Sequence, residues 1–435
     1  MHTTFINFLA DEEAWDMYVT GAAGTGKTTD LANSVQYCIQ EEIPYVVCAY
    51  THKACGILRT KLPTGARVQT LHSFLGKRPT INADALKTEH VQSSTKVGAT
   101  DEDPKILFLD EYSMVGEKDF CDIREAQDSD YDGIPALKVV WIGDCHQLPP
   151  VGDIQAINPS GDYCVTLTKQ YRNDNPLQIP LNRLISYLNG ANPEPLEAVH
   201  GYFERDLDIV SSYISCKDDK VILAFTNERV QTLNEEIAGK DEPDQGDLMF
   251  SPTTQHQYTF VKWIDYPTYI DMSYTDPLML GSKYKTLEHL IDSELCRFAE
   301  VIDEDGEVKI FAAVFGHYNY KRLNEDLANI AVDTNKAIES KHKGYKASGW
   351  SRANSKHKLA RQRAKAWRDC LSIKDCVICL DFPYAMTVHK SQGSTYHSVF
   401  IDTNDLAIIA NRNFNLYLKL TYVAISRASN YVGTN

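Results

Sequence analysis

The chain has 435 residues, 43% hydrophobic and 24% charged, a composition typical of a soluble globular protein with more than one core. A net charge of −15 argues against a surface that attracts nucleic acid everywhere, although a local basic groove remains compatible with it. There is no apolar run of membrane-spanning length and no signal-peptide pattern, and the eleven cysteines are scattered, so we expect no membrane association, reduced thiols and a cytoplasmic location.

Short apolar runs separated by helical stretches recur along the chain, which is the rhythm of an α/β fold with a parallel sheet. A first set of predicted strands covers residues 17–20, 45–49, 106–109 and 139–142. A second set covers residues 221–225, 376–380 and 398–401 and predicts a second α/β domain. Two insertions interrupt the rhythm, at 77–104 and at about 240–374, and within the second one residues 297–320 alternate like two strands around a turn.

The pair Cys376 and Cys379 has the spacing of half a zinc site. No second cysteine pair lies at a suitable spacing, and the alternation of DCVICLDF favours a buried strand. The strand is therefore the preferred interpretation of this segment.

The segment GAAGTGKT at residues 21–28 matches G-x-x-x-x-G-K-[ST] between a predicted strand and a predicted helix. Backbone N–H groups of such a loop turn towards phosphates, Lys27 reaches the β- and γ-phosphates, and Thr28 ligates Mg²⁺. The cofactors expected are therefore ATP and Mg²⁺. The residues expected to bind ATP here are Gly21, Gly24, Thr25, Gly26, Lys27, Thr28 and Thr29.

Polar residues follow two further predicted strands and supply the remaining catalytic groups. Asp110 is expected at or next to the metal, and Glu111 is expected to polarise the attacking water. Gln147 is placed to sense the γ-phosphate or to orient water. Two arginines, Arg172 and Arg427, are candidates for meeting the charge of the transition state, although each could also be a surface arginine.

The order of these motifs resembles that of superfamily 1 helicases, and within them the RecD/Dda-like branch. The resemblance rests on GAAGTGKTT at 21–29, AYTHK at 49–53, TLHSF at 70–74, DEYS at 110–113, GDCHQLPP at 143–150, QYR at 170–172, FTNERV at 225–230, MTVHKSQGS at 386–394 and YVAISR at 422–427. It covers nearly the whole chain. The resemblance extends to the small phage helicase Dda, which implies a phage or bacterial origin and a cytoplasmic location, the host cytoplasm if the protein is phage-encoded.

The resemblance implies two RecA-like domains with ATP between them and movement from 5′ to 3′ along one strand. It also implies that Arg172 and Arg427 are catalytic and that Gly393 binds ATP. The expected domains are 1–76 with 105–175, a pin-like element at 77–104, 176–240 with 375–435, and an inserted SH3-like barrel with a basic helical extension at 241–374.

The family's DNA-contacting motifs correspond here to polar and basic residues suited to phosphate and sugar contacts. Each taken alone could equally be loop polarity or a helix cap. A basic stretch at 341–368, with ten Lys or Arg and no acid, could contact DNA or form a solvated helix face. The candidates for DNA binding are Thr51, His52, Lys53, Thr70, His72, Thr387, His389 and Lys390.

Two features depart from the family. The stretch before the P-loop contains no glutamine to read adenine, and the 77–104 insertion contains no Phe, Tyr or Trp to act as a strand-splitting wedge.

From the motifs as a whole we expect an ATP-dependent DNA helicase acting in replication, recombination or repair. The alternatives are a single-strand translocase that displaces proteins with little unwinding, or a nucleic-acid-binding scaffold with a vestigial ATPase. The expected partners are single-stranded DNA, the DNA fork, and a single-strand-binding protein or replisome component, with the protein itself a monomer. The strand along which the protein moves could also be RNA.

Overall fold

The computed structural model describes residues 2–82, 87–92, 104–127, 137–150, 153–170, 176–254, 256–264, 296–346 and 377–435. The chain divides into two compact units, which are treated separately. Unit 1 comprises Met1–Thr80, Glu89–Phe225 and Thr387–Asn435, and unit 2 comprises Ile81–Thr88 and Thr226–Met386. The domain limits expected from the sequence stay a prediction.

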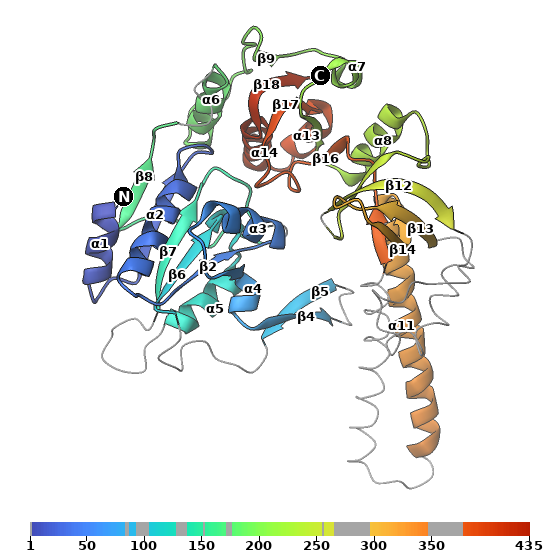
Figure 1. The fold of residues 1–435 in the computed structure, drawn as a ribbon, viewed down its shortest axis with the longest axis horizontal. Helices are drawn as coiled ribbons and strands as arrows, with labels where there is room; N and C mark the ends of the chain where they lie inside the picture. The colour runs from blue at the N-terminus through green and yellow to red at the C-terminus, as the bar shows by residue number, and fades with distance from the viewer. Residues whose placement is uncertain are drawn as a thin grey trace. The chain divides into compact units, whose positions relative to one another are not determined.

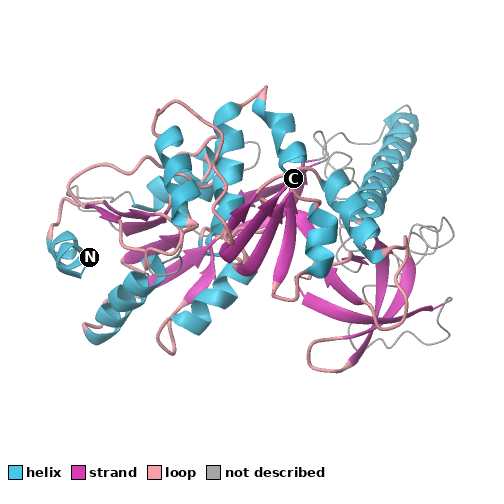
Figure 2. Cartoon of the chain, turned by 90° about the horizontal axis from the view of Figure 1, so that it is seen from above, coloured by secondary structure: helices cyan, strands magenta, loops and turns pink. Residues whose placement is uncertain are grey.

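Unit 1 contains a sheet whose strands are ordered β3-β2-β6-β7-β1-β8, with every neighbouring pair parallel (Figure 1). This confirms the parallel-sheet α/β class. The strands are β1 (Asp16–Gly21), β2 (Tyr45–Ala49), β3 (Val68–Thr70), β6 (Ile106–Asp110), β7 (Lys138–Gly143) and β8 (Cys164–Leu167). Helices lie on both sides of its strands (Figure 2), and they are α1 (His2–Ala10), α2 (Lys27–Gln40), α3 (His52–Lys61), α4 (Leu71–Phe74) and α5 (Glu117–Gln127), with the short turn η1 (Tyr112–Met114).

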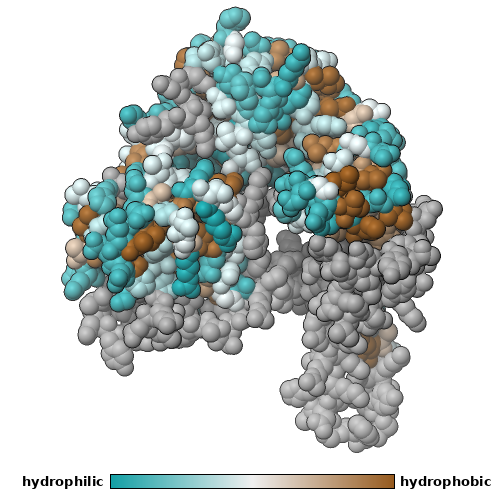
Figure 3. All heavy atoms as spheres, viewed as in Figure 1, coloured by the Kyte–Doolittle hydropathy of each residue, from teal (hydrophilic) through white to brown (hydrophobic). Residues whose placement is uncertain are grey.

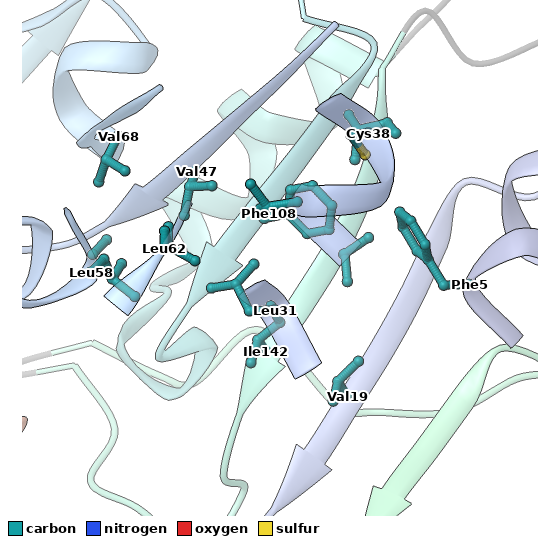
Figure 4. Packing of buried hydrophobic residues seen from close by; sticks show 14 of the residues in the cluster. Phe5, Val19, Leu31, Cys38, Val47, Leu58, Leu62, Val68, Phe108 and Ile142 are labelled. Atoms are coloured by element: carbon teal, nitrogen blue, oxygen red, sulfur yellow. The ribbon is translucent and has the colours of Figure 1, made fainter. Parts of the chain in front are cut away.

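The central strands are apolar along most of their length because both faces of the sheet are covered. In β6, Phe108 faces one hydrophobic cluster while Leu107 and Leu109 face the other. Successive side chains of a strand point to opposite faces, so a run without polar positions fits only a sheet buried on both sides. Figure 4 shows the first cluster, in which Phe5 of α1 and Leu31 of α2 pack over the strands.

A second group of parallel strands in unit 1 is ordered β10-β17-β18-β9. The strands are β9 (Phe203–Glu204), β10 (Lys220–Ala224), β17 (Tyr396–Ile401) and β18 (Ala428–Thr434), with helices α6 (Gln178–Leu188), α7 (Ile209–Ser215), α13 (Thr403–Ala410) and α14 (Phe414–Ser426). Strand β16 (Ala385–Thr387) is where the chain returns from unit 2 to unit 1.

Unit 2 is built around a mainly antiparallel sheet ordered β11-β12-β13-β14-β15. Its elements are α8 (Asn227–Ala238), β11 (Leu248–Ser251), β12 (His256–Ile264), β13 (Arg297–Ile302), β14 (Val308–Phe315), α11 (His317–Lys346) and β15 (Val377–Leu380). The expected strand pair is confirmed, because β13 and β14 form a hairpin whose turn contains Gly306 at φ +83°. In the view of Figure 3, apolar atoms gather at the surface of this sheet. The SH3-like character stays a prediction.

One sequence expectation needs correction. The run at 376–380 does form a strand, β15, but it pairs in parallel with β14 of unit 2 and not with the second parallel sheet of unit 1. This error arises because a short apolar run carries no information about which strand it pairs with. The motif at 225–230 lies at the start of a helix: β10 ends at Ala224, Thr226 caps the helix by accepting from the Arg229 N–H, and α8 follows.

Strands β4 (Lys77–Asn82) and β5 (Lys87–Gln92) form a two-stranded sheet within the 77–104 insertion, of which residues 83–86 and 93–103 lie outside the described residues. Among the helices that are described, none is long and apolar enough to cross a membrane.

Candidate active site

Three motif-bearing loops leave the same edge of the first sheet side by side. Strands β6, β7 and β1 are neighbours, and their registers pair Asp110 with Ile142 and Thr20 with Gly143. The loops that follow Gly21, Asp110 and Gly143 therefore start at one level. Ligands of open parallel sheets bind at this carboxyl edge, so the sheet itself assembles the site.

The phosphate loop joins β1 to α2 and carries two glycines in the left-handed region, Gly24 at φ +85° and Gly26 at φ +87°. Lys27 Nζ donates to Gly21 O at 2.7 Å and to Ala22 O at 2.9 Å, which places the ammonium within the loop. Thr25 Oγ1 donates to Ala22 O at 2.8 Å and closes the turn. The result is a positive charge and a helix N-terminus at one point, as phosphate binding requires.

Gly21 is required by packing. A Cβ at this position would lie 2.6 Å from Thr25 Oγ1 and 2.7 Å from the backbone oxygen of Leu167 on β8. The neighbouring strand thus approaches the start of the loop too closely for any side chain.

The two carboxylates at the end of β6 are held in an energetically unfavourable arrangement. Burial, together with the neighbouring charge of Glu111, raises the pKa of Asp110 to about 7, against the opposing charge of Lys27. Glu111 itself adopts φ +58°, a conformation rare for a residue with a side chain. Its Oε2 is buried without a hydrogen-bond partner among the described residues.

These features fit a divalent cation. A cation beside Asp110 and Glu111 would offset the repulsion that raises the Asp110 pKa and would satisfy an orphaned carboxylate oxygen. Oxygen donors of this kind, with the hydroxyl of Thr28 at the start of α2, are those preferred by Mg²⁺. The residues that could hold the metal are therefore the expected ones, Thr28 and Asp110, with Glu111 added.

The loop after β7 is connected to helix α14 by a buried network. Asp144 accepts a hydrogen bond from the Tyr422 hydroxyl at 2.7 Å and contacts His146 Nδ1 at 3.2 Å. The Asp144 hydrogen bond raises the pKa of His146 to about 10, so this imidazole is positively charged at neutral pH. Burial alone would raise the pKa of Asp144, but the His146 hydrogen bond and the Lys27 charge outweigh it, and the pKa is lowered.

Gln147 and Arg427 are both buried, each about 2% exposed. Gln392 Nε2 donates to Gln147 Oε1 at 3.4 Å, which connects the loop after β7 to the 386–394 motif. Arg427 ends α14, where its guanidinium donates to Ser426 Oγ at 2.9 Å and to Ser394 O at 3.5 Å. It thus holds the same motif from its other end. Gly393 takes φ +81° in the turn between these two contacts.

The candidate DNA-binding residues of the first sheet also lie at its carboxyl edge. Ala49 and Thr70 are register partners on β2 and β3, so Thr51 and Thr70 follow neighbouring strand ends. Both hydroxyls cap helices, Thr51 accepting from Ala54 N and Thr70 from Ser73 N. His72 Nε2 lies 3.6 Å from Asp119, a carboxylate shared with Lys77 and Tyr50.

The candidates of the second sheet have different environments. Thr387 is buried and its Oγ1 accepts from Lys390 N at 3.4 Å, while the Lys390 side chain is exposed. Burial lowers the pKa of His389 and so favours its neutral form. The backbone of Val388 donates to Ala224 O at 2.9 Å, which fixes this motif to the end of β10.

Several expected residues cannot be placed. Arg172 lies outside the described residues, as do most of the basic stretch at 341–368 and the side chains of His52 and Lys53. Conversely, sequence reasoning missed Tyr422, Asp144 and His146 as connecting residues and Asp119 as the partner of His72. Their motifs had been recognised, but no sequence signal shows that a tyrosine near the C-terminus meets an aspartate 278 positions earlier.

Comparisons with known proteins agree with this geometry. Residues 11–153 match the AAA domain family, and residues 382–433 match the UvrD-like helicase C-terminal domain family. An uncharacterized protein of Acanthamoeba polyphaga mimivirus is 23% identical over 96% of this chain and 94% of its own length. The ATP-dependent DNA helicase Pif1 of a Psychrobacter species is 27% identical over 45% of this chain, which spans 32% of that protein.

Among solved structures, the Pif1 helicase of Candida albicans is similar with a TM-score of 0.47 and 16% identity, covering 100% of this chain and 92% of that one. A TM-score below 0.5 establishes neither fold nor function. The phosphate loop, Asp110 and Asp144 lie within the match to the AAA domain family, and Gln392 and Arg427 lie within the match to the UvrD-like helicase C-terminal domain family. Membership of superfamily 1 and of its RecD-like branch stays a prediction. The nearness to Dda and a phage origin stay predictions.

Proposed function

We propose that this protein hydrolyses ATP with Mg²⁺ to move from 5′ to 3′ along single-stranded DNA and unwind duplex DNA. Lys27 binds the phosphates, Asp110 and Thr28 hold the metal, and Glu111 activates water. The observation that carries the proposal is the pair of contacts Tyr422–Asp144 and Gln392–Gln147.

These contacts supply the coupling that a motor requires. Gln147 follows the strand next to the phosphate loop, and Gln392 lies two residues beyond Lys390, a candidate for DNA contact. A change in the nucleotide that moves Gln147 is therefore transmitted directly to the segment that would hold the strand. Tyr422 connects α14 to the loop after β7, and Arg427 connects it to the 386–394 motif. The loop, the helix and the motif would therefore move together.

The first experiment measures ATP hydrolysis with and without single-stranded DNA. We expect low basal turnover, strong stimulation by the DNA, and loss of both in Lys27→Ala. Lys321→Ala is the matched control, because its ammonium is exposed on α11 and pairs only weakly with Glu325. Absence of hydrolysis under all conditions would reject the motor and favour a DNA-binding scaffold.

Direction and unwinding need a second assay. Duplexes with a 5′ or a 3′ single-stranded tail are compared with the same single strands carrying a protein block. We expect unwinding only from the 5′ tail. The 77–104 segment contains no Phe, Tyr or Trp, and this favours the second candidate, a translocase. That candidate is supported if blocks are displaced while duplexes stay intact.

A further inference from the structure

Unit 2 contains a cluster of potential metal ligands that the proposed motor does not use. His317, Cys379 and Asp381 each offer one ligand atom, and these atoms all lie within 4.8 Å of one another. The cluster joins residues from two segments that are more than 60 positions apart. We propose that these three side chains bind one Zn²⁺ ion, with water completing the coordination.

The backbone fixes all three residues in place. Strands β14 and β15 run parallel with Phe315 paired to Leu380, so His317 and Asp381 both follow the same end of the sheet. Gly316 N donates to Leu380 O at 2.9 Å, and Asp381 exchanges two backbone hydrogen bonds with Phe250 of β11, at 2.8 and 2.9 Å. The backbone positions of the three residues are therefore set by the sheet.

The side chains converge on one face. Cys379 and Asp381 are two residues apart on an extended segment, so they point to the same side, and Cys379 Sγ lies 4.0 Å from Asp381 Oδ2. Tetrahedral zinc with one thiolate needs ligand separations of roughly 3.3–3.6 Å. Binding therefore requires side-chain rotations that bring ligand atoms from up to 4.8 Å apart into this range.

The chemistry of the three groups favours zinc over a hard cation. Thiolate and imidazole are ligands of Zn²⁺, whereas Mg²⁺ and Ca²⁺ prefer oxygen only. A thiolate and a carboxylate also cancel the charge of the ion, which matters where the Cys379 side chain is 0% exposed.

A catalytic function of this cluster fits less well, and the second cluster of potential metal ligands is a weaker candidate for a zinc site. A Cys-His-Asp nucleophile must reach its substrate, and a thiol without solvent exposure cannot. The other metal-ligand cluster among the described residues, Asp144 with Cys145 and His146, is made of consecutive residues whose aspartate already bonds Tyr422. A zinc ion bound by His317, Cys379 and Asp381 would connect the start of the 30-residue helix α11 to the end of β15.

The test uses the full chain, without a histidine tag or nucleotide, stripped by a chelator and titrated with Co²⁺. We expect one Co²⁺ per chain to give a sulfur-to-metal charge-transfer band and to be displaced by equimolar Zn²⁺, whereas Co²⁺ at the oxygen ligands of the phosphate site gives no such band. Cys379→Ser should remove the band, and His317→Gln or Asp381→Asn should weaken binding by at least about 100-fold. Zn²⁺ should raise the unfolding temperature of the wild type and not that of Asp381→Asn.

Two cysteine variants serve as controls. Cys296→Ser removes an equally buried thiol of unit 2, and Cys145→Ser removes the thiol of the other cluster. Both should keep the band. No charge-transfer band in the wild type, a band retained by Cys379→Ser, or a band lost in Cys145→Ser would each overturn the proposal. The rate of DNA-stimulated ATP hydrolysis by Cys379→Ser tests the proposed motor activity independently of metal binding.

Discussion

At the scale of single residues, the site depends on atoms that have no room to move. Gly21 is enclosed by Thr25 and the backbone of Leu167, and Asp110 is buried next to a second carboxylate. These two constraints have one cause. The loops at the edge of a closely packed sheet must present backbone N–H groups and charged side chains to a phosphate group and its metal ion.

Gly21→Ala should destabilise the protein by about 1–3 kcal/mol and abolish ATP turnover, because its Cβ would overlap Thr25 Oγ1 and Leu167 O. Urea unfolding and hydrolysis assays measure both effects. Gly56→Ala is the matched control: nothing lies within 4 Å of its Cβ in α3, so we expect full activity and a gain of up to about 1 kcal/mol. Equal behaviour of the two variants would contradict the packing argument.

Asp110→Asn should stabilise the metal-free protein at pH 8 while removing activity. The folded-state pKa of Asp110 is raised to about 7, so the contribution of this group is fully present below its unfolded value near 3.8 and is lost as pH rises through 7. A neutral amide avoids that loss, which is on the order of 4 kcal/mol at pH 8 for a pKa raised from 3.8 to about 7, and much less near pH 4. Thermal unfolding in a chelator at both pH values is the measurement, and a pH-independent difference would refute it.

At the scale of elements, helix α14 connects the loop after β7 with the motif at 386–394. It packs against α13 and ends in Arg427, and along its length Tyr422 bonds Asp144 and Lys419 Nζ donates to Cys145 O at 3.0 Å. The loop after β7 is therefore held by side chains from one face of one helix.

Tyr422→Phe should cost about 1–3 kcal/mol of stability, because it leaves a buried carboxylate with one partner fewer. It should also lower the DNA-stimulated rate more than the basal rate. Tyr417→Phe lies on the same helix and removes a hydroxyl that makes no hydrogen bond within the described residues, so it should match the wild type. Stimulation unchanged in Tyr422→Phe would show that α14 does not carry the coupling.

At the scale of the whole molecule, a chain with net charge −15 must bind a polyanion through few local contacts. The screening length in physiological salt is about 8 Å, so distant acidic residues contribute little at the strand itself. Affinity should therefore fall only gently with salt compared with a uniformly basic protein.

Lys390→Ala should reduce the magnitude of the slope of log affinity against log salt by about 0.7, the amount expected for one phosphate contact on a single strand. Fluorescence anisotropy of a labelled oligonucleotide across a salt series gives this slope. Lys336→Ala, which removes an exposed ammonium on α11 paired with Asp333, should leave it unchanged. If both variants shift the slope equally, Lys390 is not a specific contact.

The sequence by itself determined the motif order, the phosphate loop, the paired carboxylates and four of the six strands of the first sheet, namely β1, β2, β6 and β7. These signals are local, because a glycine loop between a strand and a helix, or four apolar residues ending in Asp110, are read within a few positions. The β13–β14 hairpin could be read in the same way, from alternation around a turn that contains Gly306.

Only the tertiary structure decided which distant residues meet. It placed β15 beside β14, brought Tyr422 to Asp144, gave His72 the carboxylate of Asp119, and gathered His317, Cys379 and Asp381. Each of these contacts depends on strand pairing or helix packing between segments far apart in the chain. Such pairings are fixed by the burial of whole faces and by backbone hydrogen bonds, which leave no pattern within any one segment of the sequence.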